Sequence, residues 1–325
     1  MLDAFGRLPD GQEVTAVSIK GGGLTARILT HGARVQDLRR AGEDRSLVIG
    51  ASRLEPYLDG MRYFGALVGR FANRIAGASF DLEGTHYALD RNWLGKHTLH
   101  GGDGGTDQLL WTIADTGADR VRMRLCLGDG DMGFPGTLEV SVLYLLEDGA
   151  LKMEVTAETD QATPCSFAHH GYFRLRDGDA REGELQVRAA RILEVDADLI
   201  PVSPVPVDIT RYDFREMKRI GTVPLDHNFC LDGTGLRPVA AYHAGGRTLQ
   251  VETDQPGLQV FDGSNTVGTE LEDGTTLPAH AGIALETQAW PDAPNRPDFP
   301  PAILHPGETY RHRAIYRILE GRVPI

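Results

Sequence analysis

The sequence has 325 residues, of which 41% are hydrophobic, and its formal net charge at pH 7 is -13. Such a chain can bury a large core, and its composition excludes a disordered or fibrous protein. The negative charge, without clusters of Lys and Arg among aromatic residues, argues against nucleic acid and anionic membranes as partners. No segment approaches the roughly 18 apolar residues of a membrane-spanning helix, and the first residues do not resemble a signal peptide, so we expect a soluble, cytoplasmic protein.

The cysteines and the missing motifs argue against bound cofactors. Cys126, Cys165 and Cys230 are odd in number, far apart and without a C-x-x-C spacing, so neither a disulfide framework nor a thiolate metal site is indicated. The sequence contains no Gly-rich phosphate loop, no G-x-G-x-x-G between a strand and a helix, and no G-x-S-x-G. It also lacks H-E-x-x-H and H-x-H spacings. We therefore expect a reducing compartment, no cofactor and no metal ion.

In chain order, the hydrophobic pattern predicts one short helix followed by many strands. Ser52 and Glu55 have capping-box spacing in SRLEPYL, which is the best helix candidate. The clearest hairpin is residues 138–158, where Leu151, Met153, Val155 and Ala157 alternate with polar residues after the Asp148-Gly149 turn. The same two-residue period predicts strands in three further segments: 79–89 around Glu83-Gly84, 121–127 with Val121, Met123 and Leu125 inward, and 248–261.

The turns favour an all-β fold. Nine Asp-Gly pairs, from Asp10-Gly11 to Asp273-Gly274, punctuate the chain, and this dipeptide suits hairpin turns because both residues can take positive φ. The chain is too long for a simple immunoglobulin-like sandwich, so we expect a large antiparallel β-sandwich of two extended sheets packed face to face. No repeat or linker marks a boundary, and we expect residues 1–325 to form a single domain.

Two early motifs carry polar residues that have both a structural and a functional interpretation. In GRFANRI, Asn73 and Arg74 follow an aromatic residue, although an arginine is usually an exposed, solubilising residue. In KHTLHGGDGG, His100 precedes two glycines that would let a ligand approach the backbone closely. A loop histidine beside a turn is an equally good interpretation.

Three later motifs add histidines and carboxylates. In TPCSFAHHGYF, neighbouring residues of a strand point to opposite faces, so we expect one of His169 and His170 to be functional and the other to be a satisfied core residue. Asp226 in VPLDHNF is by itself best explained as a turn former. Glu286 in AGIALETQAW shares its face with Gly282, Ala284 and Gln288. Small neighbours leave room above this carboxylate, which needs a ligand or a structural salt bridge if it is buried.

Together these motifs resemble the aldose 1-epimerase (galactose mutarotase) family. The landmarks occur in this order: Gly65 to Gly77, LHGG at Leu99 to Gly102, H-x-YF at His170 to Phe173, YDFR at Tyr212 to Arg215, LDHNF at Leu225 to Phe229, LQVFDG at Leu258 to Gly263, and LETQAWPDAPN at Leu285 to Asn295. The resemblance implies a galactose mutarotase-like supersandwich that acts on a small-molecule aldose without a cofactor. It leaves the preferred sugar and the oligomeric state open.

The resemblance also assigns roles to individual residues. It implies His170 and Glu286 as acid and base, His100 as a second active-site histidine, and four sugar-binding residues: Arg74, Asp226, Asn73 and Gln259. The sequence departs from the family pattern in three places. His169 stands where the family commonly has Asn before the catalytic histidine, and Arg174 stands where it has the Asn of YFNL. The third departure is VSPVP, which replaces the usual Thr-Gly after Ile200-Pro201. These departures bear on the preferred sugar more than on the reaction.

The chemistry of anomer interconversion requires two opposed proton carriers. A proton leaves the C1 hydroxyl while another reaches the ring oxygen, the C1–C2 bond rotates and the ring recloses. Glu286 as base and His170 as acid meet this requirement, and each such group contributes on the order of 10²–10⁴ in rate. We expect a nearby carboxylate to keep His170 protonated near neutral pH. Trp290, Phe71 and Tyr172 are candidates for a surface on which the sugar stacks, although a core role is the safer assumption.

Three other functions compete with this one. A hexose-6-phosphate 1-epimerase would need extra basic residues, for which Arg174 is a candidate. A non-catalytic sugar-binding protein would lack the acid or the base, whereas this sequence keeps both His170 and Glu286. A glycosidase would use two carboxylates, for which Asp226 and Glu286 are a conceivable pair.

Overall fold

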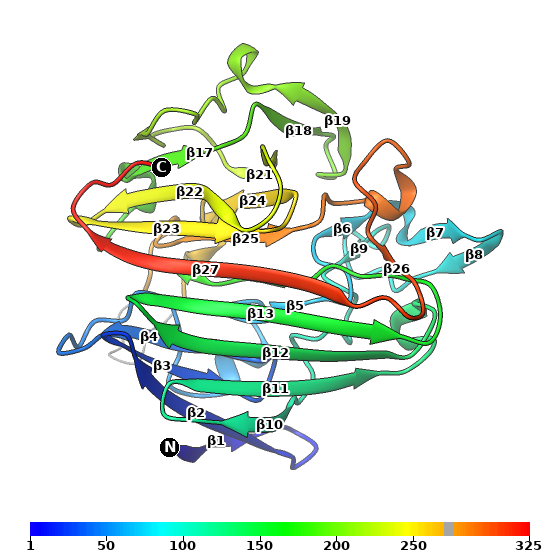
Figure 1. Cartoon of the computed structure of the whole chain (residues 1–325), viewed down its shortest axis with the longest axis horizontal. Coiled ribbons are helices and arrows are strands. Elements are labelled where there is room, and N and C mark those ends of the chain that lie inside the picture. The colour runs from blue at the N-terminus through cyan, green and yellow to red at the C-terminus, as the bar shows by residue number, and fades with distance from the viewer. Residues whose placement is uncertain (270–275) are drawn as a thin grey trace.

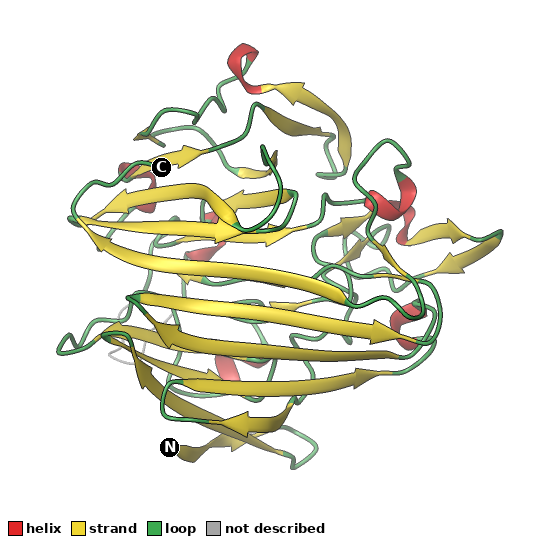
Figure 2. Ribbon diagram, viewed as in Figure 1, coloured by secondary structure: helices red, strands yellow, loops and turns green. Residues whose placement is uncertain are grey.

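The computed structural model of the chain describes residues 1–269 and 276–325 and consists almost entirely of antiparallel strands and loops (Figures 1 and 2). The broad sheet that faces the viewer in Figure 1 has nine strands. Their order across the sheet is β10 (Thr112–Thr116), β11 (Arg120–Leu127), β12 (Leu138–Glu147), β13 (Ala150–Thr159), β27 (Tyr310–Glu320), β23 (Arg247–Thr253), β22 (Arg237–Ala244), β17 (Glu184–Val187) and β20 (Lys218–Arg219).

A second sheet of six strands carries most of the residues of interest for function. Its order is β16 (Tyr172–Phe173), β25 (Ile283–Gln288), β24 (Gly257–Phe261), β21 (Asp226–Cys230), β18 (Arg191–Val195) and β19 (Pro201–Pro206). The main hydrophobic core draws on both sheets, for example on Val142 and Val155 of the first and on Leu258 and Leu285 of the second. The expected antiparallel β-sandwich is confirmed.

The remaining elements are short or lie at the margins. A four-stranded sheet is formed by β1 (Leu2–Arg7), β2 (Glu13–Gly21), β3 (Leu24–Leu29) and β4 (Arg34–Arg40). Four two-stranded pairs are β5 (Leu67–Val68) with β15 (Ala168–His169), β6 (Arg74–Ile75) with β9 (Thr98–Leu99), β7 (Ser79–Leu82) with β8 (Thr85–Ala88), and β14 (Thr163–Pro164) with β26 (Ile303–Leu304).

All helices in the described part of the chain are 3₁₀ turns of three or four residues. They are η1 (Glu55–Leu58), η2 (Ala76–Ala78), η3 (Asp131–Gly133), η4 (Ala180–Glu182), η5 (Val207–Ile209), η6 (Ser264–Thr266) and η7 (Ala293–Asn295). None of these helices is long and apolar enough to cross a membrane. The predicted capping box is wrong. The 3₁₀ turn begins at Glu55, so its N-cap residue is Leu54 and not Ser52, and Leu54 makes no side-chain cap. Pro56 lies at the start of this turn.

The strand predictions agree with the structure. β12 and β13 form the expected hairpin, and Asp148 and Gly149 both have positive φ, at 52° and 71°. β7 and β8 pair around Glu83-Gly84 in the same way. In β11, Val121 and Met123 are fully buried, whereas Leu125 is only half-buried at the margin of the core. Segment 248–261 divides between the two large sheets as β23 and β24, and the Asp273-Gly274 pair lies outside the described residues.

Candidate active site

The two faces of β25 serve different purposes. Leu285 and Thr287 face the nine-stranded sheet, where the Thr287 hydroxyl lies 2.7 Å from His312 Nε2. Glu286 and its neighbours Ala284 and Gln288 point to the opposite face, as strand alternation requires. All six residues of β25 are nevertheless buried, because loops from the first half of the chain cover this second face. A carboxylate on β25 is therefore enclosed from both sides.

Strand register arranges the covered face of the six-stranded sheet in three rows. The first row is Tyr172, Ala284, Phe261 and Asp226; the second is Glu286, Gln259 and Asn228; the third is Gln288, Gly257 and Cys230. The methyl group of Ala284 is the smallest side chain in the first row and sits beside Glu286. The predicted space above the carboxylate is thus created by a small residue between two aromatic ones.

The opposite wall of the pocket comes from β6 and β9, which pair Arg74 with Leu99. Asn73 precedes β6 with a left-handed backbone, at a φ of 67°. Its amide N–H donates to Nδ1 of His100, at 3.1 Å, and its carbonyl accepts from the His100 amide, at 3.0 Å. These reciprocal bonds fix the His100 ring. Because Nδ1 accepts a hydrogen bond, the neutral ring carries its proton on Nε2 and presents a donor.

Glycines next to His100 have a structural purpose. Gly101 has a φ of +86°, and a Cβ atom there would lie 2.1 Å from the carbonyl oxygen of Gly69. The backbone of the chain itself, and not a ligand, thus makes the close approach at Gly101. This contact explains the glycine at position 101 without a ligand, and the approach of a ligand to the backbone here stays a prediction.

His170 and Glu286 form an imidazole–carboxylate pair in the pocket. His170 lies between β15 and β16, and its Nε2 is 3.6 Å from Oε1 of Glu286. Both side chains are almost completely buried, at 7% and 2% exposure. The His170 ring lies 5.2 Å from that of His100 and 5.8 Å from that of Tyr63, measured between centroids. The rings of Tyr63 and His100 therefore lie beside this pair.

The neighbouring histidine points the other way. His169 is buried in the core, with its ring 6.2 Å from that of Phe173 and 5.3 Å from that of Tyr316. This confirms that His169 and His170 face opposite sides. The expectation that His169 is hydrogen-bonded is wrong, because neither of its ring nitrogens has a partner among the described residues. Burial lowers the pKa of His169 to about 3, so it stays neutral.

A polar network lines the pocket beside this pair. Asp226 accepts hydrogen bonds from Gln259 Nε2 at 2.5 Å and from an Arg74 guanidinium nitrogen at 3.3 Å. The Arg74 guanidinium also donates to Oδ1 of Asn73 at 3.3 Å and stacks on the Trp93 ring, 4.7 Å from its centroid. The arginine is 7% exposed, so the expectation of a solvated surface residue does not hold. The positive charge of Arg74 and the negative charge of Asp226 therefore compensate each other in the pocket.

Burial shifts the pKa values of both His170 and Glu286. It raises the pKa of Glu286 well above the ordinary value, and the Asp226 charge adds to this, while Arg74 acts in the opposite sense. Burial lowers the pKa of His170 to about 4. The expectation that a carboxylate keeps His170 protonated near neutral pH therefore fails for the protein without bound sugar, because loss of solvation outweighs the carboxylate. Both shifts favour Glu286 over His170 as the carrier of a proton that the two groups share.

His100, His170 and Glu286 each place one potential ligand atom within 4.8 Å of the others, a spacing that a divalent cation could span. The His100 tautomer opposes such a site. Its Nδ1 accepts the Asn73 amide proton, so Nε2 is protonated and has no lone pair for a metal. Burial, together with His170 and Arg74, also lowers the pKa of His100 well below its ordinary value, so this ring is a neutral donor.

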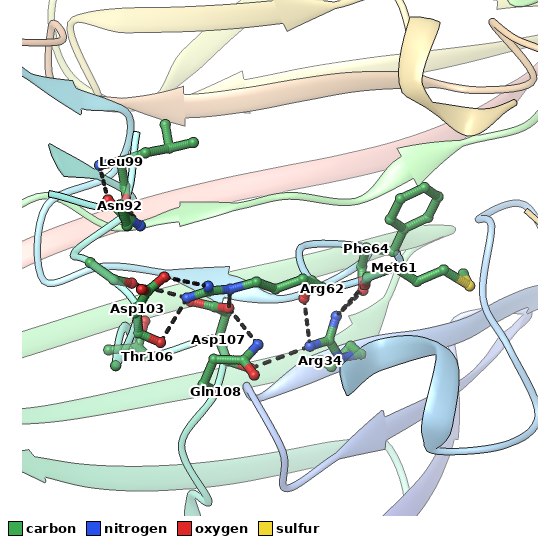
Figure 3. Close-up of polar contacts among 12 residues, drawn as sticks. Arg34, Met61, Arg62, Phe64, Asn92, Leu99, Asp103, Thr106, Asp107 and Gln108 are labelled. Atoms are coloured by element: carbon green, nitrogen blue, oxygen red, sulfur yellow. Dashed lines mark hydrogen bonds and ion pairs between the residues drawn. The ribbon is translucent and has the colours of Figure 1, made fainter. Parts of the chain in front are cut away.

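A buried arginine network holds the segment that carries Tyr63 (Figure 3). The Arg34 guanidinium donates to the carbonyl oxygens of Met61, Phe64 and Arg62, and Arg62 Nε donates to Oδ2 of the buried Asp107, at 2.8 Å. Arg62 also stacks on the Tyr63 ring, 5.1 Å from its centroid. Arg34 and Arg62, which do not line the pocket themselves, therefore fix one of its aromatic walls.

All seven predicted site residues line one pocket of about 230 Å³. They are Asn73, Arg74, His100, His170, Asp226, Gln259 and Glu286. Of the three aromatic candidates, Tyr172 lines the pocket. Phe71 and Trp290 belong to a separate hydrophobic cluster, so the expected core role is confirmed for these two. Sequence reasoning missed Tyr63, Trp93, Leu99, Phe261 and Asn265. Phe261 shares its face with Gln259 in LQVFDG, and this alternation was the one available signal.

Comparisons with known proteins agree with this geometry. A family model described as Aldose 1-epimerase matches residues 15–317. The galactose mutarotase of Bos taurus is 38% identical over 334 aligned positions, which cover 96% of this chain and 96% of that protein. The aldose 1-epimerase of Haemophilus influenzae is 35% identical, covering 90% and 91%. The solved GalM/aldose epimerase homologue from C. elegans has a TM-score of 0.89 at 25% identity, covering 94% of this chain and 99% of that chain.

Proposed function

Since the chain belongs to the aldose 1-epimerase family, we propose that it interconverts the α and β anomers of a free aldose, such as galactose or glucose, with Glu286 as base and His170 as acid. The chain is an isomerase, and its place is in carbohydrate metabolism. The observation that carries the assignment of the pair is the 3.6 Å separation of His170 Nε2 and Glu286 Oε1 inside a pocket lined by polar side chains.

Ring opening needs one proton to leave and one to arrive. Glu286 takes the proton of the C1 hydroxyl, and His170 delivers a proton to the ring oxygen as the C1–O5 bond breaks. After rotation about C1–C2, the hydroxyl at C5 attacks the other face of the aldehyde, and both protons return along the same paths. No covalent intermediate with the enzyme forms.

The reactive form of the pair is a carboxylate beside an imidazolium. It has the same net charge as the form in which Glu286 is protonated and His170 is neutral, so the two differ only by the position of one shared proton. A hydroxyl of the sugar that donates a hydrogen bond to Glu286 stabilises the carboxylate. Sugar binding thus shifts the proton to His170, where ring opening requires it.

The other polar residues hold the sugar. The Nε2–H of His100 and the guanidinium of Arg74 are donors for the hydroxyls and the ring oxygen, and Asp226 is an acceptor held in place by Gln259. Asn73 acts one step further away, because it fixes both His100 and Arg74. Tyr63, Trp93 and Tyr172 give the apolar faces of a sugar ring flat surfaces to contact.

Charge favours a free sugar over a sugar phosphate. Arg74 is the one lysine or arginine among the described residues that line the pocket, and Asp226 balances it. Arg174, the candidate for a phosphate contact, is not among the lining residues and instead binds Asp177, at 2.8 Å. A phosphate dianion would therefore find no surplus cation.

Replacement of Glu286 by Gln tests the proposal. The side chain keeps its size but loses the base, so mutarotation followed by polarimetry should fall by on the order of 10²–10⁴ after correction for the uncatalysed rate. Arg39→Met on the remote strand β4 serves as a control that should keep wild-type activity. Wild-type turnover by Glu286→Gln would reject the assignment, and faster turnover on glucose 6-phosphate than on glucose would reject the free-sugar proposal.

Two further expectations remain proposals. We propose that residues 1–325 form one domain, since the nine-stranded sheet combines strands from Thr112 to Glu320. We also propose a cytoplasmic location, which the free state of Cys126, Cys165 and Cys230 supports.

A further inference from the structure

The first row of the covered face has two chemically different ends. Tyr172 lies at one end and Asp226 at the other, with Ala284 and Phe261 between them. Adjacent strands lie about 4.8 Å apart, so the row is roughly 14 Å long. His170 belongs to the Tyr172 end, because it lies just before β16 and its ring is 5.2 Å from that of Tyr172.

This asymmetry orients a sugar in the pocket. In the proposed reaction, Glu286 takes the proton of the C1 hydroxyl and His170 protonates the ring oxygen. Glu286 lies on β25, one strand nearer to Asp226 than β16. The ring oxygen is bonded to C5, which carries the exocyclic C6 group, whereas C1 is bonded to C2. C5 and C6 therefore extend toward Tyr172, and C2 extends toward Asp226.

At the Tyr172 end, a hydroxyl and an amide meet at the mouth of the pocket. Nδ2 of Asn265 donates a hydrogen bond to the Tyr172 hydroxyl at 3.1 Å, and both residues line the pocket. Asn265 is exposed and Tyr172 is buried, so the contact lies where the pocket reaches the surface. Burial raises the pKa of Tyr172, so its hydroxyl keeps its proton and can donate it. Oδ1 of Asn265 is an acceptor, and the two side chains together offer a ligand one donor and one acceptor.

Buried neighbours hold both side chains in place. Asn265 lies in η6 next to Thr266, which is 0% exposed and whose hydroxyl accepts from the amide of Ala281 at 2.9 Å. The Tyr172 ring stacks on that of Phe64, with 4.1 Å between the centroids. A ligand that meets this donor and acceptor therefore finds them already positioned, which reduces the entropy lost on binding.

We propose that Asn265 and the Tyr172 hydroxyl bind the C6 hydroxyl of a hexose and so make hexoses better substrates than pentoses and 6-deoxyhexoses. The C6 hydroxyl donates to Oδ1 of Asn265 and accepts from the Tyr172 hydroxyl. Neither side chain is a cation, so this site suits a hydroxyl and not a phosphate. The inference rests on the proposed function, because the places of C1 and the ring oxygen follow from the roles of Glu286 and His170.

The experiment compares galactose with 6-deoxygalactose, which lacks only the C6 hydroxyl. Tyr172→Phe and Asn265→Ala each remove one of the two hydrogen bonds, so the ratio of kcat/KM for galactose to that for 6-deoxygalactose should fall about tenfold in each variant. A residue that only supports the fold would lower both values equally and leave the ratio unchanged. Ser264→Ala, in the same turn but outside the described lining of the pocket, is the matched control and should keep the wild-type ratio. The exposed Asn265 carries the test if Tyr172→Phe does not fold.

A crystal structure of Glu286→Gln with galactose gives a readout that is independent of activity. The C6 oxygen should lie within hydrogen-bonding distance of both Asn265 and the Tyr172 hydroxyl. A C6 oxygen at Asp226, or an unchanged substrate ratio in either variant, would overturn the inference while the proposed function stands. Full mutarotase activity of Glu286→Gln would instead remove the proposed function, whatever the ratio does.

Discussion

Replacement of Arg34 by Met should weaken both the fold and the binding of sugar, although Arg34 does not line the pocket. Arg34 is 0% exposed and its guanidinium donates to four backbone carbonyl oxygens, those of Met61, Arg62, Phe64 and Asp107 (Figure 3). Burial lowers its pKa to about 10, so it is still charged near neutral pH. Methionine would keep most of the apolar stem but leave these carbonyls without their donor.

The expected loss follows from the number of broken contacts. At about 1 kcal/mol for each carbonyl left unpaired, the free energy of unfolding should fall by roughly 3–4 kcal/mol, which for a chain of 325 residues corresponds to a decrease in Tm of roughly 4–6 °C. The freed segment carries Tyr63, so KM should also rise. Thermal denaturation and polarimetry measure the two effects. The control Arg39→Met replaces an arginine of the same strand whose side chain is 41% exposed, and it should show neither effect. An Arg34→Met protein with the Tm and KM of the wild type would refute the reasoning.

Two other outcomes follow from the pocket. Because burial lowers the pKa of His170 to about 4, kcat measured by polarimetry should show no acid limb at the ordinary histidine value; an acid limb near 6.5 would contradict this. Arg74→Lys retains the charge but not the fork that spans Asn73 and Asp226, so KM should rise about 10–100-fold with a smaller effect on kcat, and an unchanged KM would disprove the anchoring role.

The sequence predicted those features that depend on local geometry. Alternation alone placed Glu286, Ala284 and Gln288 on one face of a strand and separated His169 from His170, because the side-chain period of a strand is two whatever its partners are. The Asp148-Gly149 turn was equally local, since its conformation depends on the two residues themselves.

Features that depend on distant partners were out of reach. Tyr63 and Trp93 enter the pocket from loops without any hydrophobic period, and Arg34 is buried only because carbonyls at 61–64 and 107 meet it there. The protonation of His170 was misjudged for the same reason. A neighbouring carboxylate was visible in the motifs, but the loss of water around both groups follows from the covering loops and outweighs it.

Enclosure of β25 on both faces explains why a costly buried carboxylate suits this reaction. In water, the ordinary pKa values of Glu and His differ by about two units in favour of the carboxylate and imidazolium, so the proton would rest on His170 with or without a sugar. Burial raises the pKa of Glu286 and lowers that of His170, so it works against this order and gives hydrogen bonds to Glu286 an influence on where the proton lies. A hydroxyl at C1 is one such donor, so the acid is charged at the moment when its target lies beside it. A solvent-exposed pair at the same 3.6 Å would lack this dependence on bound sugar.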